Sequence, residues 1–465
     1  MCRNELLATL IPHGQEQLLT FWDRLDAAGR DALADQIRAV DLDLIARLYR
    51  DRASRSDIVA LARRAEEPPA FRLDATHNRF TIQQARQRGN EALRAGEVGA
   101  MLVAGGQGTR LGFDHPKGMF PIGPVSGRSL FQIHVEKILA LRRRHGVRVP
   151  LYLMTSPATH EETVRFFAEH GRFGLPEEDL KIFCQGTMPA VDAATGKLLL
   201  ASPGCLAVSP DGHGGMLAAF ARSGAVADAR RRGCRELFYF QVDNPLVDIC
   251  GAEYIGYHRL AGAEMTSQVI AKREPLEKVG NVVAVDGRLM VIEYSDLPDE
   301  VAQRRNADGS LAVWAGSIAV HVFDLAFLER MAASADALPF HYASKKVAAI
   351  DAWGQPMQPE KPNAIKFERF IFDLMPSARN AIVVEVYPAR AFAPLKNAPG
   401  AKLDTPEAVQ GQMIALHSDW LRRAGAEVAA GVPVEISPLF ALDADELRGK
   451  VRPGMRVAAA RYFQP

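Results

Sequence analysis

Residues 101–112 of the chain are Met-Leu-Val-Ala-Gly-Gly-Gln-Gly-Thr-Arg-Leu-Gly, an apolar run that leads directly into closely spaced glycines. The apolar run is typical of a buried strand, and the glycines allow the backbone to approach a ligand closely. Several backbone N–H groups can then converge on an anion, and two cations, Arg110 and Lys117, follow nearby. This segment therefore predicts a phosphate-binding loop at the end of a strand, with a plain turn as the alternative.

Two common nucleotide-binding motifs do not fit this loop. A Walker A loop requires GxxxxGK[ST], but Gly112 is followed by Phe113 and Asp114. A dinucleotide-binding fingerprint requires GxGxxG at the start of a helix, but three residues separate Gly108 from Gly112, and Pro116 would interrupt a helix. The sequence therefore disfavours both a P-loop NTPase and a dehydrogenase.

Short apolar runs alternate with amphipathic segments on both sides of the loop, which predicts βαβ units and an α/β fold with a mostly parallel sheet. The predicted strands are residues 99–104, 150–155, 180–184 and 237–242. The predicted helices are residues 83–95, 130–144, 160–170, 216–231, 324–331, 366–374 and 406–423. The dipeptide Asp286-Gly287, between apolar residues 282–285 and 289–293, predicts a hairpin.

The pattern changes towards both ends of the chain. Apolar residues recur at helical spacing through residues 4–64, and short strand-like pieces occupy residues 432–436 and 455–459. We therefore expect an N-terminal helical region at residues 1–75, a central domain at residues 76–400 and a small C-terminal α/β domain at residues 401–465.

Composition limits the classes of function. Fifty-six Lys and Arg residues balance 55 Asp and Glu residues, so no global field attracts nucleic acid or an anionic membrane. The five cysteines are scattered and lack CxxC spacing, which indicates neither disulfides nor zinc and fits a reducing cytoplasm. No apolar run reaches about 18 residues, so we expect neither an export signal nor a membrane span.

The glycine-rich segment and the following His-Pro-Lys-Gly-Met-Phe at residues 115–120 resemble the nucleotide-binding signature of the UDP-sugar pyrophosphorylases. The similarity is greatest to the eukaryotic-type UDP-N-acetylglucosamine pyrophosphorylases. It continues in order through PDGHGG at 210–215, QVDN at 241–244, VG at 279–280, VIEYS at 291–295, AGSIA at 315–319, KPNAIK at 361–366 and PLKN at 394–397. The resemblance implies a Rossmann-like nucleotidyltransferase domain with a mixed, mostly parallel sheet, between smaller N- and C-terminal parts.

The resemblance also implies a reaction: UTP and a sugar 1-phosphate give a UDP-sugar and pyrophosphate. Gly105 and Gly106 are then expected to contact the uridine, and Gln185 and Gly214 match the positions that recognise and pack the base. An amide side chain suits uracil, which presents both hydrogen-bond donors and acceptors. An ordinary surface glutamine remains the alternative for Gln185.

Two polyanions meet in this reaction, so charge neutralisation and positioning are its main requirements, and no protein nucleophile is needed. We assign Arg110 to the β- and γ-phosphates of UTP, Lys117 to the α- or leaving phosphates, and Lys396 to the sugar phosphate. Lys366 is expected to support the sugar phosphate, or to be a solvated helix residue instead.

Asp243 follows the apolar run at residues 237–242, where ligands gather in an open parallel sheet. Mg²⁺ is commonly held by one or two carboxylates and by substrate phosphates, so Asp243 is the candidate metal residue. An aspartate that caps a turn is the alternative.

The candidate sugar residues give conflicting indications of which sugar 1-phosphate is the substrate. Glu293 resembles the residue that accepts hydrogen bonds from sugar hydroxyls, and Gly280 resembles the glycine that lets the backbone approach the sugar. His213 and Ser317 stand where the N-acetylglucosamine enzymes are expected to have asparagine. We expect N-acetylglucosamine 1-phosphate as the substrate, with a glucose 1-phosphate or broad-specificity enzyme as the alternative.

Outside this reaction, the competing hypothesis is a non-catalytic nucleotide-sugar sensor. A sensor has no need of every polyanion contact, yet Arg110, Lys117, Asp243 and Lys396 are all present. The expected partners are thus UTP and a sugar 1-phosphate, with neither nucleic acid nor membrane.

Overall fold

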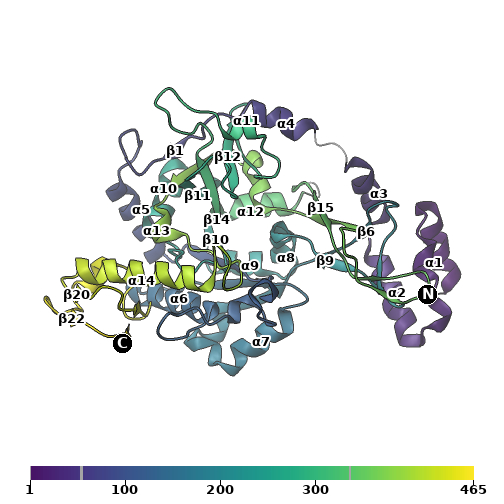
Figure 1. Cartoon of the computed structure of the whole chain (residues 1–465), viewed down its shortest axis with the longest axis horizontal. Coiled ribbons are helices and arrows are strands. Elements are labelled where there is room, and N and C mark those ends of the chain that lie inside the picture. Colours follow the sequence, from purple (N-terminus) through teal and green to yellow (C-terminus); the bar gives the residue numbers. More distant parts are fainter. Residues whose placement is uncertain (1, 53–55, 335–336) are drawn as a thin grey trace. The chain divides into compact units, whose positions relative to one another are not determined.

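The computed structural model describes residues 2–52, 56–334 and 337–465, and its backbone contacts divide the chain into two units (Figure 1). The small unit comprises Met1–Ile58, Gln185–Met216 and Leu338–Asp373. The large unit comprises Val59–Cys184, Leu217–Ala337 and Leu374–Pro465. Each unit is therefore built from stretches that are far apart in the sequence.

The large unit contains a ten-stranded sheet with the order β1-β19-β11-β14-β10-β2-β3-β4, in which the β12–β13 hairpin attaches to β14. The strands are β1 Ala70–Phe71, β2 Val98–Val103, β3 Leu151–Thr155, β4 Leu180–Cys184, β10 Glu236–Gln241, β11 Met265–Ala271, β12 Gly280–Val285, β13 Arg288–Ile292, β14 Ala315–Asp324 and β19 Ala381–Glu385. Strands β10, β2, β3 and β4 run parallel, whereas β14 is antiparallel to both β10 and β11. The prediction of an α/β fold with a mixed, mostly parallel sheet is confirmed.

Strands β2 and β3 are buried along their whole length, as expected for parallel strands covered on both faces. The helices of this unit include α5 Ile82–Arg94, α6 Leu130–His145, α7 His160–Glu169, α10 Ala252–Ala261, α12 Leu325–Ala332 and α14 Pro406–Arg423. Helix α6 begins after Ser129, whose hydroxyl accepts a hydrogen bond from the Gln132 amide, and ends at Gly146 in the left-handed conformation.

Helices α5 and α10 lie side by side and pack through two glycines (Figure 1). A Cβ atom on Gly89 would lie 1.7 Å from the carbonyl oxygen of Ala252, and one on Gly256 would lie 1.7 Å from that of Ala85. Because backbone occupies the space that a side chain would need, neither position accepts a larger residue without moving a helix.

Most of the predicted elements agree with the observed ones, including the strands β2, β3, β4 and β10 and the helices α5, α6, α7, α12 and α14. The predicted helix at residues 216–231 is two helices, α8 Met216–Arg222 and α9 Ala225–Arg231, separated at Gly224 with φ of 70°. The hairpin is confirmed, with Asp286 and Gly287 both at positive φ between paired Val285 and Arg288.

The predicted helix at residues 366–374 is wrong. Residues Ala364–Glu368 form strand β18, which pairs antiparallel with β15 His341–Lys345, and a 3-10 helix, η9 Ile371–Ser377, follows. A short run of mixed polar and apolar residues fits both helical and strand patterns. Here the pairing with β15 determines that residues 364–368 form a strand. Lys366 is consequently a strand residue. Similarly, Glu293 lies one residue beyond β13 rather than inside it.

The small unit has a hydrophobic core of its own. Helices α1 Arg3–Leu10, α2 Ala27–Ala39 and α3 Leu42–Asp51 agree with the predicted helical region, which continues as α4 Ser56–Arg63; residues 53–55 of that prediction lie outside the described residues. Four small sheets of described residues complete the unit. They are β15-β18-β6 with β6 at Val191–Asp192, β5 Thr187–Pro189 with β9 Val208–Pro210, β7 Leu200–Ser202 with β8 Cys205–Leu206, and β16 Ala349–Ile350 with β17 Pro356–Met357.

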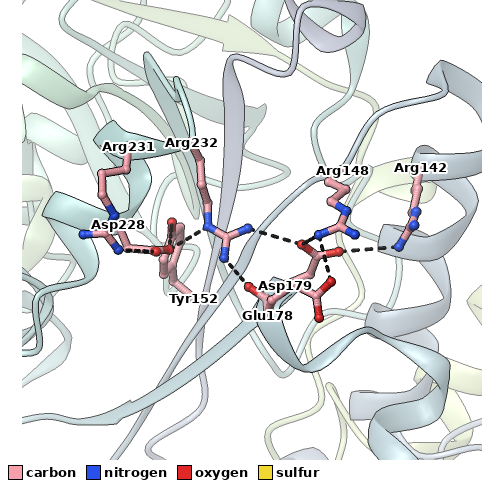
Figure 2. A network of polar contacts seen from close by, with 8 residues as sticks. All are labelled: Arg142, Arg148, Tyr152, Glu178, Asp179, Asp228, Arg231 and Arg232. Atoms are coloured by element: carbon pink, nitrogen blue, oxygen red, sulfur yellow. Dashed lines mark hydrogen bonds and ion pairs between the residues drawn. The ribbon is translucent and has the colours of Figure 1, made fainter.

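At the amino ends of β3 and β4, a polar network joins several elements of the large unit (Figure 2). The Asp179 carboxylate is 2% exposed and lies 3.5 Å from Arg142, 3.6 Å from Arg148 and 3.3 Å from Arg232. The Tyr152 hydroxyl donates a 2.9 Å hydrogen bond to Asp228. The buried Asp179 charge is thus paired with several arginines. The network lies at the amino ends of the strands, away from their carboxyl ends.

The end of the large unit forms a compact part around its own cluster of apolar residues. It contains β20 Glu427–Val428, β21 Val434–Ile436, α15 Ala444–Leu447, β22 Arg456–Val457 and β23 Arg461–Phe463. The Glu435 carboxylate accepts hydrogen bonds from the backbone N–H groups of Val125 and Ser126, at 2.8 and 2.7 Å, and so joins this part to the segment before α6. Over the described residues, none of the helices combines the length and apolar character needed to span a bilayer.

Candidate active site

The glycine-rich loop leaves the carboxyl end of β2 and folds back on itself. The N–H of Gly108 donates to the carbonyl of His115 at 2.9 Å, and the N–H of Lys117 donates to that of Gly106 at 3.0 Å. The Ser156 hydroxyl donates to the Gly105 carbonyl at 2.7 Å. Only short 3-10 turns, η4 Thr109–Leu111 and η5 Lys117–Met119, occur in this loop, so the loop differs from both a P-loop and a dinucleotide-binding turn.

The two cations of this loop have different surroundings. Arg110 is exposed and has no salt bridge to a residue in the described part of the chain. Lys117 is half-buried, and its Nζ donates a hydrogen bond of 3.2 Å to the carbonyl oxygen of Leu395. Arg110 is thus available to a ligand, while Lys117 is held beside the segment that contains Lys396.

Asp243 follows β10 and contacts the same segment through its backbone. Its carbonyl oxygen accepts a 2.9 Å hydrogen bond from the N–H of Leu395. The neighbouring Asn244 side chain donates to the carbonyl of Ala391 at 2.7 Å and accepts from the N–H of Ala393 at 3.0 Å. The structure therefore brings together Lys117, Asp243 and Lys396, which are far apart in the sequence, around the backbone of Leu395.

One further residue lies here, Asp404, which the sequence patterns did not indicate. Its carbonyl oxygen accepts hydrogen bonds from the N–H groups of Lys396 at 2.9 Å and Asn397 at 3.0 Å, and its φ is 59°. Burial raises the pKa of the Asp404 carboxyl, which the Lys396 ammonium opposes and the Asp243 carboxylate reinforces. Asp404 precedes Thr405-Pro406, where a helix starts, so the sequence predicts no more than a residue near a helix cap.

Three candidate sugar residues, Gly280, Glu293 and Ser317, lie close together at the open end of the β12–β13 hairpin, far from its turn. Gly280 on β12 pairs with Ser317 on β14. A Cβ atom on Gly280 would lie 2.8 Å from Cγ1 of Val291, 3.3 Å from Oε1 of Glu293 and 3.8 Å from Cβ of Ser317. Gly280 therefore lies directly beside the Glu293 carboxylate, and an added side chain there would collide with Val291.

The remaining candidate residues lie in the small unit, where Gln185 is buried. Its side-chain nitrogen is 3.4 Å from Oδ1 of Asp211 and 3.3 Å from the carbonyl oxygen of Gly212. The Asp211 carboxylate also forms a 2.7 Å ion pair with Arg369, and the Arg369 carbonyl accepts from the N–H of Gly214 at 2.7 Å. Asp211 and Arg369, which the sequence analysis did not single out, thus fix Gln185 and Gly214.

His213 is packed among aromatic rings and is half-buried. Its ring stacks on Phe370, with centroids 5.1 Å apart, and its Nδ1 accepts a 3.2 Å hydrogen bond from the N–H of Ile371. Burial, assisted by the charge of His341, lowers the pKa of His213 to about 4. The ring is therefore neutral near pH 7 and has its proton on Nε2.

The fourth small-unit candidate, Lys366, lies on β18 opposite Ala343, half-buried and without an ion pair to any described residue. Nine of the candidates thus form three local groups: Lys117, Asp243 and Lys396; Gly280, Glu293 and Ser317; and Gln185, His213 and Gly214. Among the described residues, no three His, Cys, Asp or Glu side chains cluster as a ready-made metal site. Asp243, with Asp404 nearby, suits a cation whose remaining ligands are phosphate oxygens.

A mostly parallel sheet that places cations and a carboxylate beside a glycine-rich loop suits the transfer of a phosphate-linked nucleotide. The family described as UTP–glucose-1-phosphate uridylyltransferase matches residues 48–419, and the chain belongs to this family. The enzymes of this class generally depend on a divalent metal ion.

Relatives resemble the chain over most of its length. It is 34% identical over 459 residues to UDP-N-acetylglucosamine pyrophosphorylase of Saccharomyces cerevisiae, covering 95% of this chain and 96% of that protein. It is 36% identical over 426 residues to UDP-N-acetylhexosamine pyrophosphorylase-like protein 1 of Xenopus tropicalis, with 89% and 83% covered. The crystal structure of the Trypanosoma brucei UDP-N-acetylglucosamine pyrophosphorylase with an inhibitor superimposes with a TM-score of 0.81 at 28% identity, covering 97% and 95%. The predicted family and fold are confirmed.

Proposed function

We propose that the chain transfers the uridylyl group of UTP to N-acetylglucosamine 1-phosphate and releases pyrophosphate. The observation that best supports the chemistry is the convergence of Lys117, Asp243 and Lys396 on the Leu395 backbone. The printed names of the yeast and trypanosome relatives support the choice of sugar.

Charge neutralisation is the main task of the phosphate residues. A phosphate oxygen of the sugar 1-phosphate attacks the α-phosphorus of UTP, and the bond from that phosphorus to the β-phosphate oxygen breaks. Lys396 binds the attacking phosphate and reduces its repulsion with UTP. Lys117 contacts the phosphate at the reaction centre, and the exposed Arg110 binds the β- and γ-phosphates as they leave. Gly105 and Gly106 allow the backbone to approach the uridine.

Asp243 is the proposed protein ligand of Mg²⁺. Mg²⁺ is commonly bound by only one or two carboxylates, so a carboxylate at the end of a strand suits it. Asp404 is close enough for the Asp243 charge to raise the pKa of its carboxyl. When bound, the ion would withdraw charge from the phosphate oxygens of UTP. The protein's contribution is to hold the Asp243 carboxylate at a fixed place.

Gln185 is the proposed uracil-binding residue. Its side-chain nitrogen donates to Asp211 and Gly212, so the amide oxygen is the atom assigned to accept a hydrogen bond from the base. Uracil offers one at N3–H, whereas cytosine has an unprotonated N3. This orientation favours UTP over CTP.

The sugar is bound by polar groups that suit an N-acetylhexosamine. Glu293, which lies beside the backbone of Gly280, accepts hydrogen bonds from sugar hydroxyls. His213 has a fixed N–H donor at Nε2, which can donate to a carbonyl or hydroxyl oxygen, and Ser317 adds a hydroxyl. The positively charged Lys366 supports the sugar phosphate. The alternative, a preference for glucose 1-phosphate, follows from His213 and Ser317 replacing the expected asparagines.

The experiment is to incubate the protein with UTP, Mg²⁺ and N-acetylglucosamine 1-phosphate and to measure pyrophosphate and the UDP-sugar. Both products should form in equal amounts and only when all three components are present. Binding of the UDP-sugar without any turnover would support a nucleotide-sugar sensor instead. Replacing UTP with CTP is the matched control, and it should abolish most of the activity.

A further inference from the structure

Two side chains of helix α6 hold the loop that contains Asp243. This loop, residues 242–247, is termed the Asp243 loop. The Nε2 of His134 donates a 3.0 Å hydrogen bond to the carbonyl of Val242. The Nζ of Lys137 donates to the carbonyls of Pro245 at 2.6 Å and Val247 at 2.7 Å. His134 and Lys137 are three residues apart, so one face of α6 contacts both the start and the end of the loop.

These contacts fix the backbone on both sides of the Asp243 Cα atom. The Val242 carbonyl belongs to the peptide group before Asp243, and His134 holds it. The Asp243 carbonyl belongs to the peptide group after it, and the Leu395 N–H holds it at 2.9 Å. With both peptide planes anchored, the Cα–Cβ direction is set, and so is the region that the carboxylate can reach.

At the position of His134, an apolar side chain would favour stability more than a histidine does. The side chain is fully buried, and its Nδ1 has no hydrogen-bond partner in the described part of the chain. Burying such a polar group without a partner costs free energy, which an apolar side chain of similar size would avoid. The hydrogen bond from Nε2–H offsets this cost, and its acceptor is the carbonyl of Val242, in the peptide group before Asp243.

We propose that His134 and Lys137 are positioning residues that hold the Asp243 carboxylate in place for the divalent cation bound with UTP. Neither residue contacts substrate in this account; both act through the Asp243 loop. The inference rests on the proposed role of Asp243. It predicts that removing either donor weakens the contribution of the metal to UTP binding.

The test is calorimetric titration of UTP into the full-length protein with and without Mg²⁺, which requires no turnover. In the unmodified protein, Mg²⁺ should tighten UTP binding. His134→Leu and Lys137→Met should each reduce this tightening about tenfold, the effect typical of losing a residue that orients a metal ligand. UTP binding without Mg²⁺ should be unchanged. His134→Gln retains an N–H donor and should restore most of the effect.

Leu141→Ala is the matched control, because Leu141 is a buried core residue of the same helix. It should lower the melting temperature without changing the effect of Mg²⁺. If His134→Leu does not fold, His134→Met and Lys137→Met provide the same comparison. An unchanged Mg²⁺ effect in the donor-removing variants would overturn the proposal. If Asp243→Asn also leaves the Mg²⁺ effect unchanged, the proposed metal role of Asp243 fails instead.

Discussion

The Nζ of Lys117 donates a 3.2 Å hydrogen bond to the carbonyl oxygen of Leu395, which lies 278 residues further along the chain. The N–H of Leu395 in turn binds the carbonyl of Asp243. One peptide segment therefore links the glycine-rich loop, the end of β10 and Lys396. In the proposed reaction this arrangement places two cations and a carboxylate around the phosphates that meet.

Lys396→Ala should reduce turnover about 100-fold, because a charge that stabilises the meeting phosphates is lost. The dissociation constant of UTP should change by less than about threefold, since Lys396 is assigned to the sugar phosphate. Steady-state kinetics and UTP titration measure the two effects. Lys402→Ala, an exposed lysine of the same segment, is the control and should affect neither. Equal losses in turnover and UTP affinity would contradict the role of Lys396.

Gly280→Ala should raise the KM for the sugar 1-phosphate about tenfold, with UTP affinity unchanged. The added methyl group would lie 2.8 Å from Cγ1 of Val291 and displace the hairpin that positions Glu293. The double variant Gly280→Ala/Val291→Ala removes that contact and should recover most of the affinity for the sugar. A normal KM in the single variant would show that the sugar does not bind beside Gly280.

Gly89→Ala and Gly411→Ala should change stability in opposite directions. Both glycines lie within helices, but a Cβ on Gly89 would collide with the Ala252 carbonyl, whereas one on Gly411 meets no atom within 4 Å. We expect Gly89→Ala to destabilise by about 2 kcal/mol or more, through displacement of α10. Gly411→Ala should stabilise by about 0.5–1 kcal/mol, because alanine favours the helix. Urea unfolding measures both, and a stabilising Gly89→Ala would contradict the close packing of α5 and α10.

Acidification should destabilise the fold through three buried histidines. Burial lowers the pKa of His134, His258 and His417 to about 3, whereas each has a pKa near 6.5 when unfolded. Below pH 6.5 the unfolded chain binds protons that the folded chain does not. Stability is therefore full above pH 6.5 and is lost as the pH falls towards 3.

At pH 5, one such histidine accounts for about 2 kcal/mol of lost stability. The measurement is urea unfolding at pH 7.5 and 5.0, for the unmodified chain and for His258→Gln. The variant should lose about 2 kcal/mol less on acidification. The same pH dependence in both proteins would show that His258 does not titrate in this way.

Local patterns predicted the parts of the fold that depend on neighbouring residues. The strand before the glycine-rich loop, the helix α6 and the turn at Asp286-Gly287 all follow from periodicity and turn chemistry within a few residues. The resemblance supplied the motifs with Lys117, Asp243 and Lys396. The structure adds that the Lys117 side chain and the Asp243 backbone both contact Leu395, the residue before Lys396.

Non-local contacts decided what the sequence could not predict. Residues 364–368 form a strand because β15 is available as a partner, which no local pattern reveals. Asp404 joins the site because its carbonyl binds the N–H groups of Lys396 and Asn397, and the small unit is assembled from three separated stretches. His134 lies within a predicted helix, and only its contact with Val242 distinguishes it from other core residues.

Uridylyl transfer is tested most simply by the initial rate of pyrophosphate release with UTP and Mg²⁺, comparing N-acetylglucosamine 1-phosphate with glucose 1-phosphate at matched concentrations. Pyrophosphate should be released when both UTP and sugar are present, with a higher kcat/KM for the N-acetylated sugar. Faster release with glucose 1-phosphate would show that His213 and Ser317 set a different specificity, and no release with either sugar would contradict uridylyl transfer to these sugars.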